Sequence, residues 1–211
     1  MLERPLIACA ASLEGGGVAD TLLGVGKAAA AMRATELLLH ERPPWLLLIG
    51  VCGAYPRGAG RPALSVGDLC LVGEDVLADE GVGLAGGEFR GIAALGLGDE
   101  GPFLADVART RTIAERLGVP IVSGATVSTC SGSDELSRAL AARGSAQVES
   151  MEGAAVLQVC HHLGVAAVQL RCVSNLTGER TAAGWDLDGA LARLHAAVRT
   201  LGREWRWEGV G

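Results

Sequence analysis

Short apolar runs alternate with longer segments of mixed polarity along the whole chain. The continuous apolar run at 45–51, the short apolar run at 6–11 and the segment 165–173 predict buried strands. Further strands are expected at 21–25, 68–76, 119–123 and 146–149. The mixed segments place polar residues at helical spacing and predict helices at 27–40, 103–117, 134–143, 152–163 and 187–201. Strands that alternate with helices predict an α/β sandwich around a mainly parallel sheet. The Gly- and Pro-rich segment 52–65 predicts a loop, and 79–101 shows no clear period.

Size and composition suit one folded unit. The chain has 211 residues, of which 49% are hydrophobic and 20% charged, so a sizeable core is possible and disorder is not expected. No linker, low-complexity tract or internal repeat interrupts the pattern. We therefore expect residues 1–211 to form a single domain.

Charge, cysteine spacing and hydropathy argue against several classes of function. The net charge is −6 and no cluster of Lys and Arg forms a phosphate-tracking stripe, which argues against a nucleic-acid polymer as partner. The six cysteines include no CxxC pair, which predicts buried thiols rather than a metal site or a disulfide framework. No apolar run reaches the roughly 20 residues of a membrane helix, and 1–11 is too short and poorly flanked for a signal peptide. We therefore expect a cytoplasmic protein with no bound metal and no membrane partner.

Polar side chains gather where the predicted strands end. In an α/β sheet the ligand lies beyond the carboxyl ends of the strands. The segments that follow strands contain, in chain order, Glu14, Thr126, Ser128, Glu149, Glu152, Asn175 and Arg180. Carboxylates, an amide and the Gly-rich string GVCGAY at 50–55 together predict a pocket for a small polar ligand.

Several of these residues also have an ordinary structural explanation. A carboxylate at a helix start, such as Glu152, is favoured by the helix dipole alone. Glu14 fits a solvated loop, and Asn175 fits a turn. Gly24 and Gly26 suggest a dinucleotide loop, but a third glycine and a suitably placed acidic residue are missing. Spacing alone therefore leaves the chemistry of the site open.

Five groups of residues resemble, in chain order, the nucleoside phosphorylase/nucleosidase superfamily. They are LIACAASLE (6–14), GVGKAAAAM (24–32), GVCGAY (50–55) with SVGDLCLV (65–72), VESMEGAA (148–155) and LRCVSN (170–175). The resemblance spans most of the chain. It implies a three-layer αβα sandwich with a mixed, mainly parallel sheet, no cofactor, and assembly as a homodimer or higher homo-oligomer.

The same resemblance implies roles for the candidate residues. Glu14 is expected to activate the attacking water, Glu152 to hold the ribose hydroxyls and Asn175 to face the purine. Met151 is expected to pack on the ribose. Ser150 interrupts the acidic-Met-Glu triplet of the adenine-specific enzymes, which leaves the role of Glu149 open. The other expected substrate contacts are Gly53, Ala54, Thr126, Val127, Ser128 and Arg180, the last toward a carboxylate-bearing aryl end of the substrate.

Within the superfamily, ESMEGAA (149–155) and SNLTGER (174–180) resemble the futalosine hydrolases of the alternative menaquinone pathway. The adenine-specific nucleosidases carry an Asp at the position of Asn175. An Asn amide has two donor hydrogens, which suit the two acceptors N7 and O6 of a 6-oxopurine, whereas adenine presents a donor amino group beside N7. The resemblance therefore implies hydrolysis of the N-ribosidic bond of futalosine, with release of hypoxanthine and dehypoxanthine futalosine.

The loop SLEGGG at 12–17 favours water over phosphate as the nucleophile. Phosphorylases of the superfamily present an Arg after the first strand, and this loop has no cation. Three alternatives stay open at this point. They are an adenine-releasing nucleosidase acting on methylthioadenosine, adenosylhomocysteine or aminofutalosine, a nucleoside phosphorylase, and a non-catalytic protein that binds purine nucleosides.

Overall fold

The fold is that of a computed structural model, which describes residues 2–56, 64–179 and 184–205. The elements in chain order are β1 (Leu6–Cys9), α1 (Ser12–Gly15), β2 (Thr21–Leu22), α2 (Lys27–Glu41), β3 (Trp45–Ala54), β4 (Leu69–Leu77), β5 (Gly81–Gly83), the short 3-10 helix η1 (Ala85–Gly87), β6 (Phe89–Gly91), β7 (Phe103–Leu104), α3 (Val107–Leu117), β8 (Ile121–Thr126), α4 (Asp134–Ala142), β9 (Val148–Ser150), α5 (Gly153–Leu163), β10 (Ala166–Leu176) and α6 (Leu187–Gly202).

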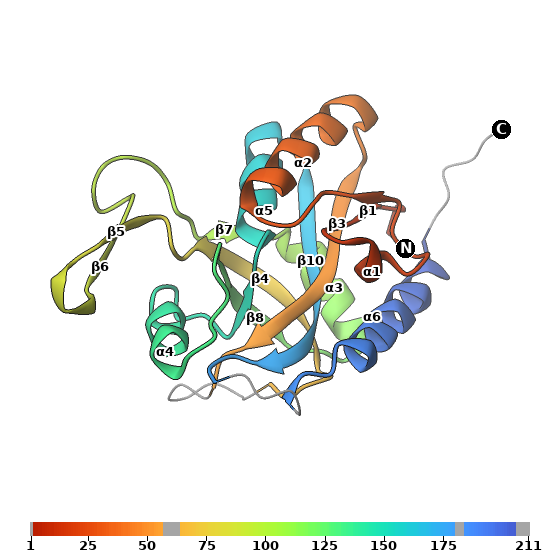
Figure 1. The fold of residues 1–211 in the computed structure, drawn as a ribbon. Coiled ribbons are helices and arrows are strands. Elements are labelled where there is room, and N and C mark those ends of the chain that lie inside the picture. The colour runs from red at the N-terminus through yellow and green to blue at the C-terminus, as the bar shows by residue number, and fades with distance from the viewer. Residues whose placement is uncertain (1, 57–63, 180–183, 206–211) are drawn as a thin grey trace.

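The main sheet closes on itself. Strands β10, β4, β8, β9 and β3 follow one another, and β3 also pairs with β10, so these strands form a barrel-like ring. Strands β1 and β2 extend the sheet from β3, and β7 pairs with β4. Figure 1 shows the two long strands β3 and β10 side by side through the centre of the molecule.

The sheet is mixed and mainly parallel. The pairs β1–β2, β1–β3, β3–β10, β4–β8 and β8–β9 are parallel, and β4–β10, β3–β9 and β4–β7 are antiparallel. The prediction of an α/β fold with a mixed sheet is confirmed. An open sandwich of three layers does not describe the closed part, because there the sheet encloses side chains instead of presenting two open faces.

The side chains of the continuous apolar run of β3 pack against helices on both faces of the sheet. Successive side chains of a strand point to opposite faces. Leu46 and Leu48 belong to the core under α2 and α5, whereas Leu47 and Ile49 belong to the core under α3 and α6. A strand buried on both sides lacks polar alternation, which explains the string WLLLIG. Beyond these layers, Val72, Val122 and Val173 are among the side chains that fill the interior of the ring.

Three strands run further than predicted. Strand β3 continues through 52–54, which the sequence analysis assigned to a loop, and β8 and β10 extend to Thr126 and Leu176. The extensions of β3 and β10 pair with each other, and those of β3 and β8 pair with β9: Gly53 lies opposite both Glu149 and Asn175. Residues expected in loops just after these strands therefore lie on the strands themselves, near their carboxyl ends.

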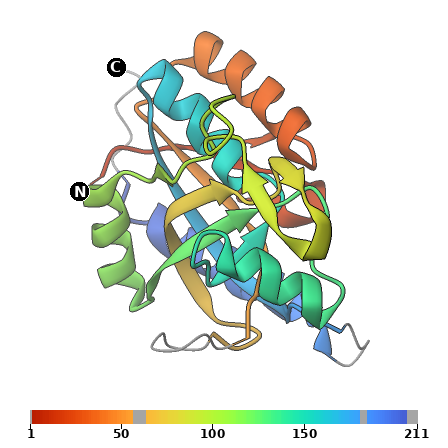
Figure 2. The same ribbon diagram turned by 90° about the vertical axis from the view of Figure 1, so that its left-hand side faces the viewer.

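The predicted helix at 103–117 begins later. Phe103 and Leu104 form β7 against β4, and α3 starts after Asp106, whose side chain accepts a hydrogen bond from the N–H of Arg109 at 2.8 Å. This side chain caps the helix, as Asp does at many helix starts. The unassigned segment 79–101 contains the hairpin β5–β6, which extends from the body of the molecule (Figures 1 and 2).

The cysteines are free thiols, and five are buried, with Cys130 half-buried. Within the described ranges, no helix combines the length and apolarity that a bilayer crossing requires. The same ranges contain no group of three or more His, Cys, Asp or Glu side chains placed to hold a metal ion.

Candidate active site

Glu14 turns its carboxylate inward from the short helix α1. Its side chain is only 6% exposed. Oε2 accepts hydrogen bonds from the N–H groups of Ala10 and Ala11, both at 3.1 Å, and Oε1 accepts one from the N–H of Val51 on β3 at 2.9 Å. The ring of His195 on α6 bonds to the backbone oxygen of Glu14 at 2.8 Å. This carboxylate is therefore held between two strand ends and is not a solvated loop group.

Glu152 directly precedes α5, where the helix dipole favours a carboxylate. Its side chain nevertheless makes no capping hydrogen bond to α5, and Oε1 accepts instead from the N–H of Gly26, at the start of α2, at 2.9 Å. Burial raises the pKa of Glu152, and the positive charge of Arg171 offsets part of that rise. The charge of Glu14 raises it further, so the two carboxylates lie within electrostatic reach of each other.

A buried arginine that the sequence analysis did not single out lies beside both carboxylates. Arg171, in the middle of β10, is 1% exposed and donates from Nη2 to Oε1 of Gln169 at 3.2 Å. A Cβ added to Gly50 would lie 2.4 Å from Nη1 of Arg171 and 2.7 Å from Oε1 of Glu14, so both groups approach the same space over β3. The sequence signal for it is one Arg inside an apolar strand, where an uncompensated charge is costly.

Asn175 lies near the end of β10, opposite Gly53, and is 9% exposed. Its Oδ1 accepts from the hydroxyl of Ser174 at 3.0 Å, and its Nδ2 donates to the carbonyl of Leu176 at 3.0 Å. The second Nδ2 hydrogen has no partner among the described residues. A cavity of about 340 Å³ adjoins this amide, and Trp185 forms part of its wall. The amide is thus oriented by the protein and still offers a donor.

Glu149, whose role the sequence left open, is satisfied by protein groups. It is 3% exposed and accepts from the hydroxyl of Tyr55 at 3.0 Å and from the N–H and hydroxyl of Ser131 at 2.9 and 2.6 Å. A Cβ on Gly53 would meet both Cγ of Glu149 and Nδ2 of Asn175 at 3.3 Å. Glu149 therefore braces the wall of the site around Asn175.

The structure gives Thr126 a different place from the predicted one. Its side chain is fully buried, its hydroxyl donates to Oδ1 of Asp75 at 3.0 Å, and its oxygen accepts from the N–H of Ala154 at 2.7 Å. A hydroxyl has a single donor hydrogen. That donor is used inside the protein, so this side chain serves the framework behind the site.

Val127 and Ser128 follow β8 directly. Val127 is fully buried, and its N–H donates to the carbonyl of Ser150 at 2.9 Å. Ser128 is exposed, and its N–H donates to Oδ2 of Asp79 at 2.6 Å. Its hydroxyl is therefore at the surface, beside the segment that leads to Met151.

The remaining candidates divide into three groups. Gly53 and Ala54 are buried on β3, and a Cβ on Gly53 would lie 2.9 Å from Cγ2 of Thr177, so this position needs a glycine for close packing. Met151 is half-buried beside Glu152. Arg180 lies outside the described residues.

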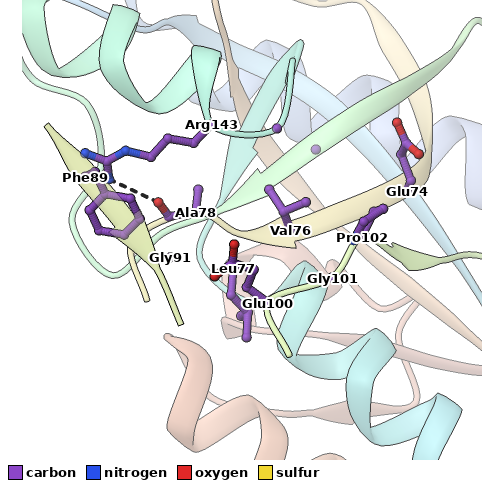
Figure 3. A pocket seen from close by; sticks show the side chains of 12 residues that line it. Glu74, Val76, Leu77, Ala78, Phe89, Gly91, Glu100, Gly101, Pro102 and Arg143 are labelled. Atoms are coloured by element: carbon purple, nitrogen blue, oxygen red, sulfur yellow. Dashed lines mark hydrogen bonds between the residues drawn. The ribbon is translucent and has the colours of Figure 1, made fainter. Parts of the chain in front are cut away.

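A second cavity, of about 370 Å³, lies between β4, the end of α4 and the hairpin β5–β6 (Figure 3). The guanidinium of Arg143 stacks over the ring of Phe89 at 3.8 Å and donates to the carbonyl of Ala78 at 3.0 Å. Carboxylates of Glu74 and Glu100 also line it, so its charges are mixed. None of the candidate residues lines this cavity, and the candidate active site lies elsewhere, at Glu14 and Glu152.

Comparison with known proteins identifies the family of the chain. Residues 8–203 match the model of the phosphorylase superfamily. A futalosine hydrolase from Thermus thermophilus is 38% identical over 194 residues, which cover 90% of this chain and 83% of that protein. A 5'-methylthioadenosine/S-adenosylhomocysteine nucleosidase from Geobacillus kaustophilus is 34% identical over 195 residues, covering 88% of this chain and 79% of that protein.

A solved structure shares the fold at much lower identity. A futalosine hydrolase mutant from Helicobacter pylori matches with a TM-score of 0.80, over 96% of this chain and 100% of that chain, at 17% identity. At this identity the match supports the architecture, and the chemistry depends on the side chains described above.

Proposed function

The chain belongs to the phosphorylase superfamily, and from this premise we propose that it hydrolyses the N-ribosidic bond of futalosine, releasing hypoxanthine and dehypoxanthine futalosine. The observation that carries the proposal is the pair of buried carboxylates, Glu14 and Glu152, beside the buried guanidinium of Arg171. The two curated relatives described above are named a hydrolase and a nucleosidase, which supports water as the second reactant.

Glu152 stabilises the sugar in this mechanism. Cleavage of a ribosyl C–N bond passes through an oxocarbenium-like state in which positive charge grows on the ribose. A carboxylate that accepts hydrogen bonds from the 2'- and 3'-hydroxyls strengthens those bonds as the charge develops. Glu152 suits this task because its helix does not use the side chain as a cap.

Glu14 orients and deprotonates the attacking water. The N–H groups of Ala10, Ala11 and Val51 hold its carboxylate in one position, so no rearrangement is needed in the transition state. Arg171 faces the same space and keeps this buried negative charge compensated. A base fixed within reach of the water fits general base catalysis, which contributes about 10²–10⁴-fold to a rate.

Asn175 recognises the leaving base. Its Nδ2 retains a hydrogen for an acceptor, and the acceptors N7 and O6 lie together on the edge of a 6-oxopurine. Hydrogen bonding to the departing base also stabilises the negative charge that it gains. We assign further substrate contacts to Met151, Val127, Ser128, Gly53 and Ala54, and Thr126 is left out because its hydroxyl is engaged.

Phosphate is disfavoured as the nucleophile. The α1 loop carries no cation, and Glu14 occupies the place next to the nucleophile. Two carboxylates beside a single guanidinium give a site that repels a phosphate dianion. The same charges accept a neutral water.

An adenine-releasing nucleosidase is the second candidate, because a relative with that type of name is 34% identical. Asn175 favours the 6-oxopurine, since its free Nδ2 hydrogen finds two neighbouring acceptors, N7 and O6, on hypoxanthine, whereas adenine offers N7 alone beside a donor amino group. A buried donor left without an acceptor costs about 1–3 kcal/mol. The two candidates therefore differ in the base that they release.

The test is base release from futalosine, aminofutalosine and methylthioadenosine in parallel, with and without phosphate. Hypoxanthine from futalosine alone, independent of phosphate, supports the proposal. Adenine from the other two substrates moves the assignment to the second candidate. Turnover only with phosphate identifies a phosphorylase, and tight nucleoside binding without turnover identifies a binding protein.

Two further parts of the proposal concern context. The reaction belongs to the menaquinone pathway that futalosine serves, and we place it in the cytoplasm. The working form is a homodimer or higher homo-oligomer, as symmetric assemblies are common among soluble enzymes. Light scattering at the assay concentration tests the assembly, and a monomer would contradict it.

A further inference from the structure

A polar layer separates two apolar clusters in the closed part of the sheet. Along one face of β10, Ala167 belongs to the core under α2 and α5, and Val173 belongs to the interior of the ring. The residues between them on the same face, Gln169 and Arg171, are polar and at most 1% exposed. Asp75 of β4 joins them at 1% exposure. A polar layer at this depth costs free energy for each unpaired group, and Nε of Arg171 has no hydrogen-bond partner among the described residues.

Asp75 is the centre of this layer. Its Oδ1 accepts from the hydroxyl of Thr126 at 3.0 Å, and its Oδ2 accepts from Nε2 of Gln169 at 3.1 Å. A β-bulge between Val72 and Glu74 shifts the register of β4 against β8, so Asp75 rather than Glu74 turns into the layer. In the ionised form of Asp75 both oxygens are acceptors only, which fixes the direction of every bond that follows.

The first arm runs from Asp75 to Arg171. A carboxylate accepts hydrogen bonds, so Gln169 must present its NH₂ group to Asp75 and its carbonyl oxygen to the other side. That oxygen accepts from Nη2 of Arg171 at 3.2 Å. With the amide reversed, two donor groups would face each other at Arg171. Asp75 therefore sets which face Gln169 shows to the guanidinium beside Glu14.

The second arm runs from Asp75 to the start of α5. The hydroxyl of Thr126 donates its hydrogen to Asp75. The hydroxyl oxygen of Thr126 accepts a hydrogen bond from the N–H of Ala154, the second residue of the helix. This bond satisfies a donor that a helix normally pairs with its own capping side chain. Glu152 stands at the capping position but makes no such bond. Thr126 caps the helix in place of Glu152, so the carboxylate of Glu152 is not used as a cap and is available to the site.

The layer is packed too tightly for a substitute. A Cβ on Gly153, which follows Glu152, would lie 2.2 Å from Oδ2 of Asp75 and 2.4 Å from Oε1 of Gln169. A Cβ on Gly124 would lie 2.9 Å from Cγ of Asp75. Only glycine at positions 124 and 153 leaves room for the side chains of Asp75 and Gln169.

We propose that Asp75 is a positioning residue for the hydrolysis: through Gln169 it holds Arg171 beside Glu14, and through Thr126 it leaves Glu152 free to bind the ribose. The inference rests on the proposed function, because it assigns Asp75 to the same site. At 1% exposure, Asp75 lies behind the residues assigned to the substrate. It acts through the direction of the hydrogen bonds that it accepts.

Reversal of the network provides the test. In Asp75→Asn, the new NH₂ group faces Gln169 or Thr126, both of which are donors, and one arm is lost. In the double variant D75N/Q169E, the Asn donates to the Glu, so the bond between residues 75 and 169 reforms in the opposite direction. Arg171 still donates to residue 169 and Thr126 still donates to residue 75, and the net charge is unchanged. We expect D75N to lower kcat on futalosine by about tenfold or more with KM changed by less than about threefold, because Glu14 and Arg171 act on the transition state. The double variant should recover kcat to within about threefold of the parent.

Thermal stability separates positioning from folding. Each variant is assayed well below its own Tm, and the Tm values form a second double-mutant cycle. Recovery of both kcat and Tm in D75N/Q169E supports the proposal. Recovery of Tm without kcat, or a kcat of D75N equal to that of the parent, overturns it, since the network would then serve stability alone. If the parent protein releases no base from any nucleoside, the proposed function fails, while the Tm cycle still tests the hydrogen-bond network.

A second pair of variants covers the case in which D75N does not fold. Thr126→Ser keeps the hydroxyl and Thr126→Val removes it at nearly the same volume. We expect kcat/KM to fall by about fivefold or more in T126V and to stay within about twofold in T126S. Equal activity of the two would overturn the second arm. Asp106→Asn is the matched control for charge removal, because Asn caps a helix as well as Asp and this residue lies outside the layer, at the start of α3.

Discussion

The carboxylate of Glu14 and the guanidinium of Arg171 converge on the space above Gly50. A methyl group there would lie 2.7 Å from Oε1 of Glu14 and 2.4 Å from Nη1 of Arg171. The glycine that opens the string GVCG is thus required by the approach of two charged groups from β10 and α1. The two groups carry opposite charges and lie in a place closed to solvent.

Substitution of this glycine should damage the site more than the fold. In Gly50→Ala, the added methyl must push Arg171 or Glu14 aside, and overpacking of this kind costs about 1–3 kcal/mol of stability. We expect kcat to fall by about tenfold or more, because the base moves relative to the water. Gly132→Ala is the matched control, since a Cβ at Gly132 meets nothing within 4 Å. Unchanged kcat in G50A would show that the two groups are free to move apart.

The charge of Glu152 should matter for the sugar. In Glu152→Gln, the amide oxygen can still accept from Gly26, but the negative charge opposite the developing oxocarbenium is gone. We expect kcat/KM on futalosine to fall by about 10²-fold, measured by release of hypoxanthine. Glu36→Gln, on the exposed face of α2, serves as a control for the same chemical change and should keep full activity.

The identity of residue 175 should determine the base. Asn175→Asp replaces the donor NH₂ group with an acceptor at neutral pH, or with a protonated acid that donates to N7 and accepts from an adenine amino group. We expect the ratio of kcat/KM for futalosine over aminofutalosine to fall by about 10–100-fold, the effect of one mispaired buried group. A ratio that does not change would remove Asn175 from base recognition.

Asp75 should make stability depend on pH. Burial raises its pKa from 3.8 to about 6, against the lowering effects of Gln169, Thr126 and the charge of Arg171. Between these two values the folded protein binds more protons than the unfolded chain, so the free energy of unfolding falls as pH rises from about 4 to above 6. The free energy of unfolding falls by about 3 kcal/mol over this range, because the pKa of Asp75 is 3.8 in the unfolded chain and about 6 in the folded protein.

Urea unfolding of the parent and of D75N at several pH values measures this effect. The variant loses the titrating group but keeps Glu152, whose raised pKa gives a slope of the same sign in both proteins. The stability of the parent relative to D75N should therefore decrease with rising pH over this window. A constant difference would mean that the pKa of Asp75 is the same in the folded protein and in the unfolded chain.

The local sequence pattern was sufficient to predict the class of fold, and it indicated candidate residues for the site. Hydrophobic periodicity predicted the helices and most strands because side-chain spacing is a local property. Strand ends drew attention to Glu14, Glu152 and Asn175, whose roles stay predictions. Closure of the sheet depends on the pairing of β3 with β10 and with β9, and strand pairing between distant segments is not a local property.

Contacts between distant segments decided the rest. The burial of Glu14 depends on the N–H of Val51, far along the chain, and the sequence alone equally allowed a solvated loop. Arg171 was overlooked because a single charge inside an apolar run does not change the prediction of a strand. Thr126 was expected to contact substrate, but β8 extends further than its pattern suggests and turns this side chain toward Asp75.

The most direct test of the account is the rate of hypoxanthine release from futalosine in phosphate-free buffer by the parent protein and by Glu14→Gln. The glutamine keeps the size of the side chain and removes the base. The account predicts turnover by the parent and a loss of about 10²–10⁴-fold in kcat for E14Q with the protein still folded. Equal rates for the two proteins, or no hypoxanthine from the parent, would contradict it.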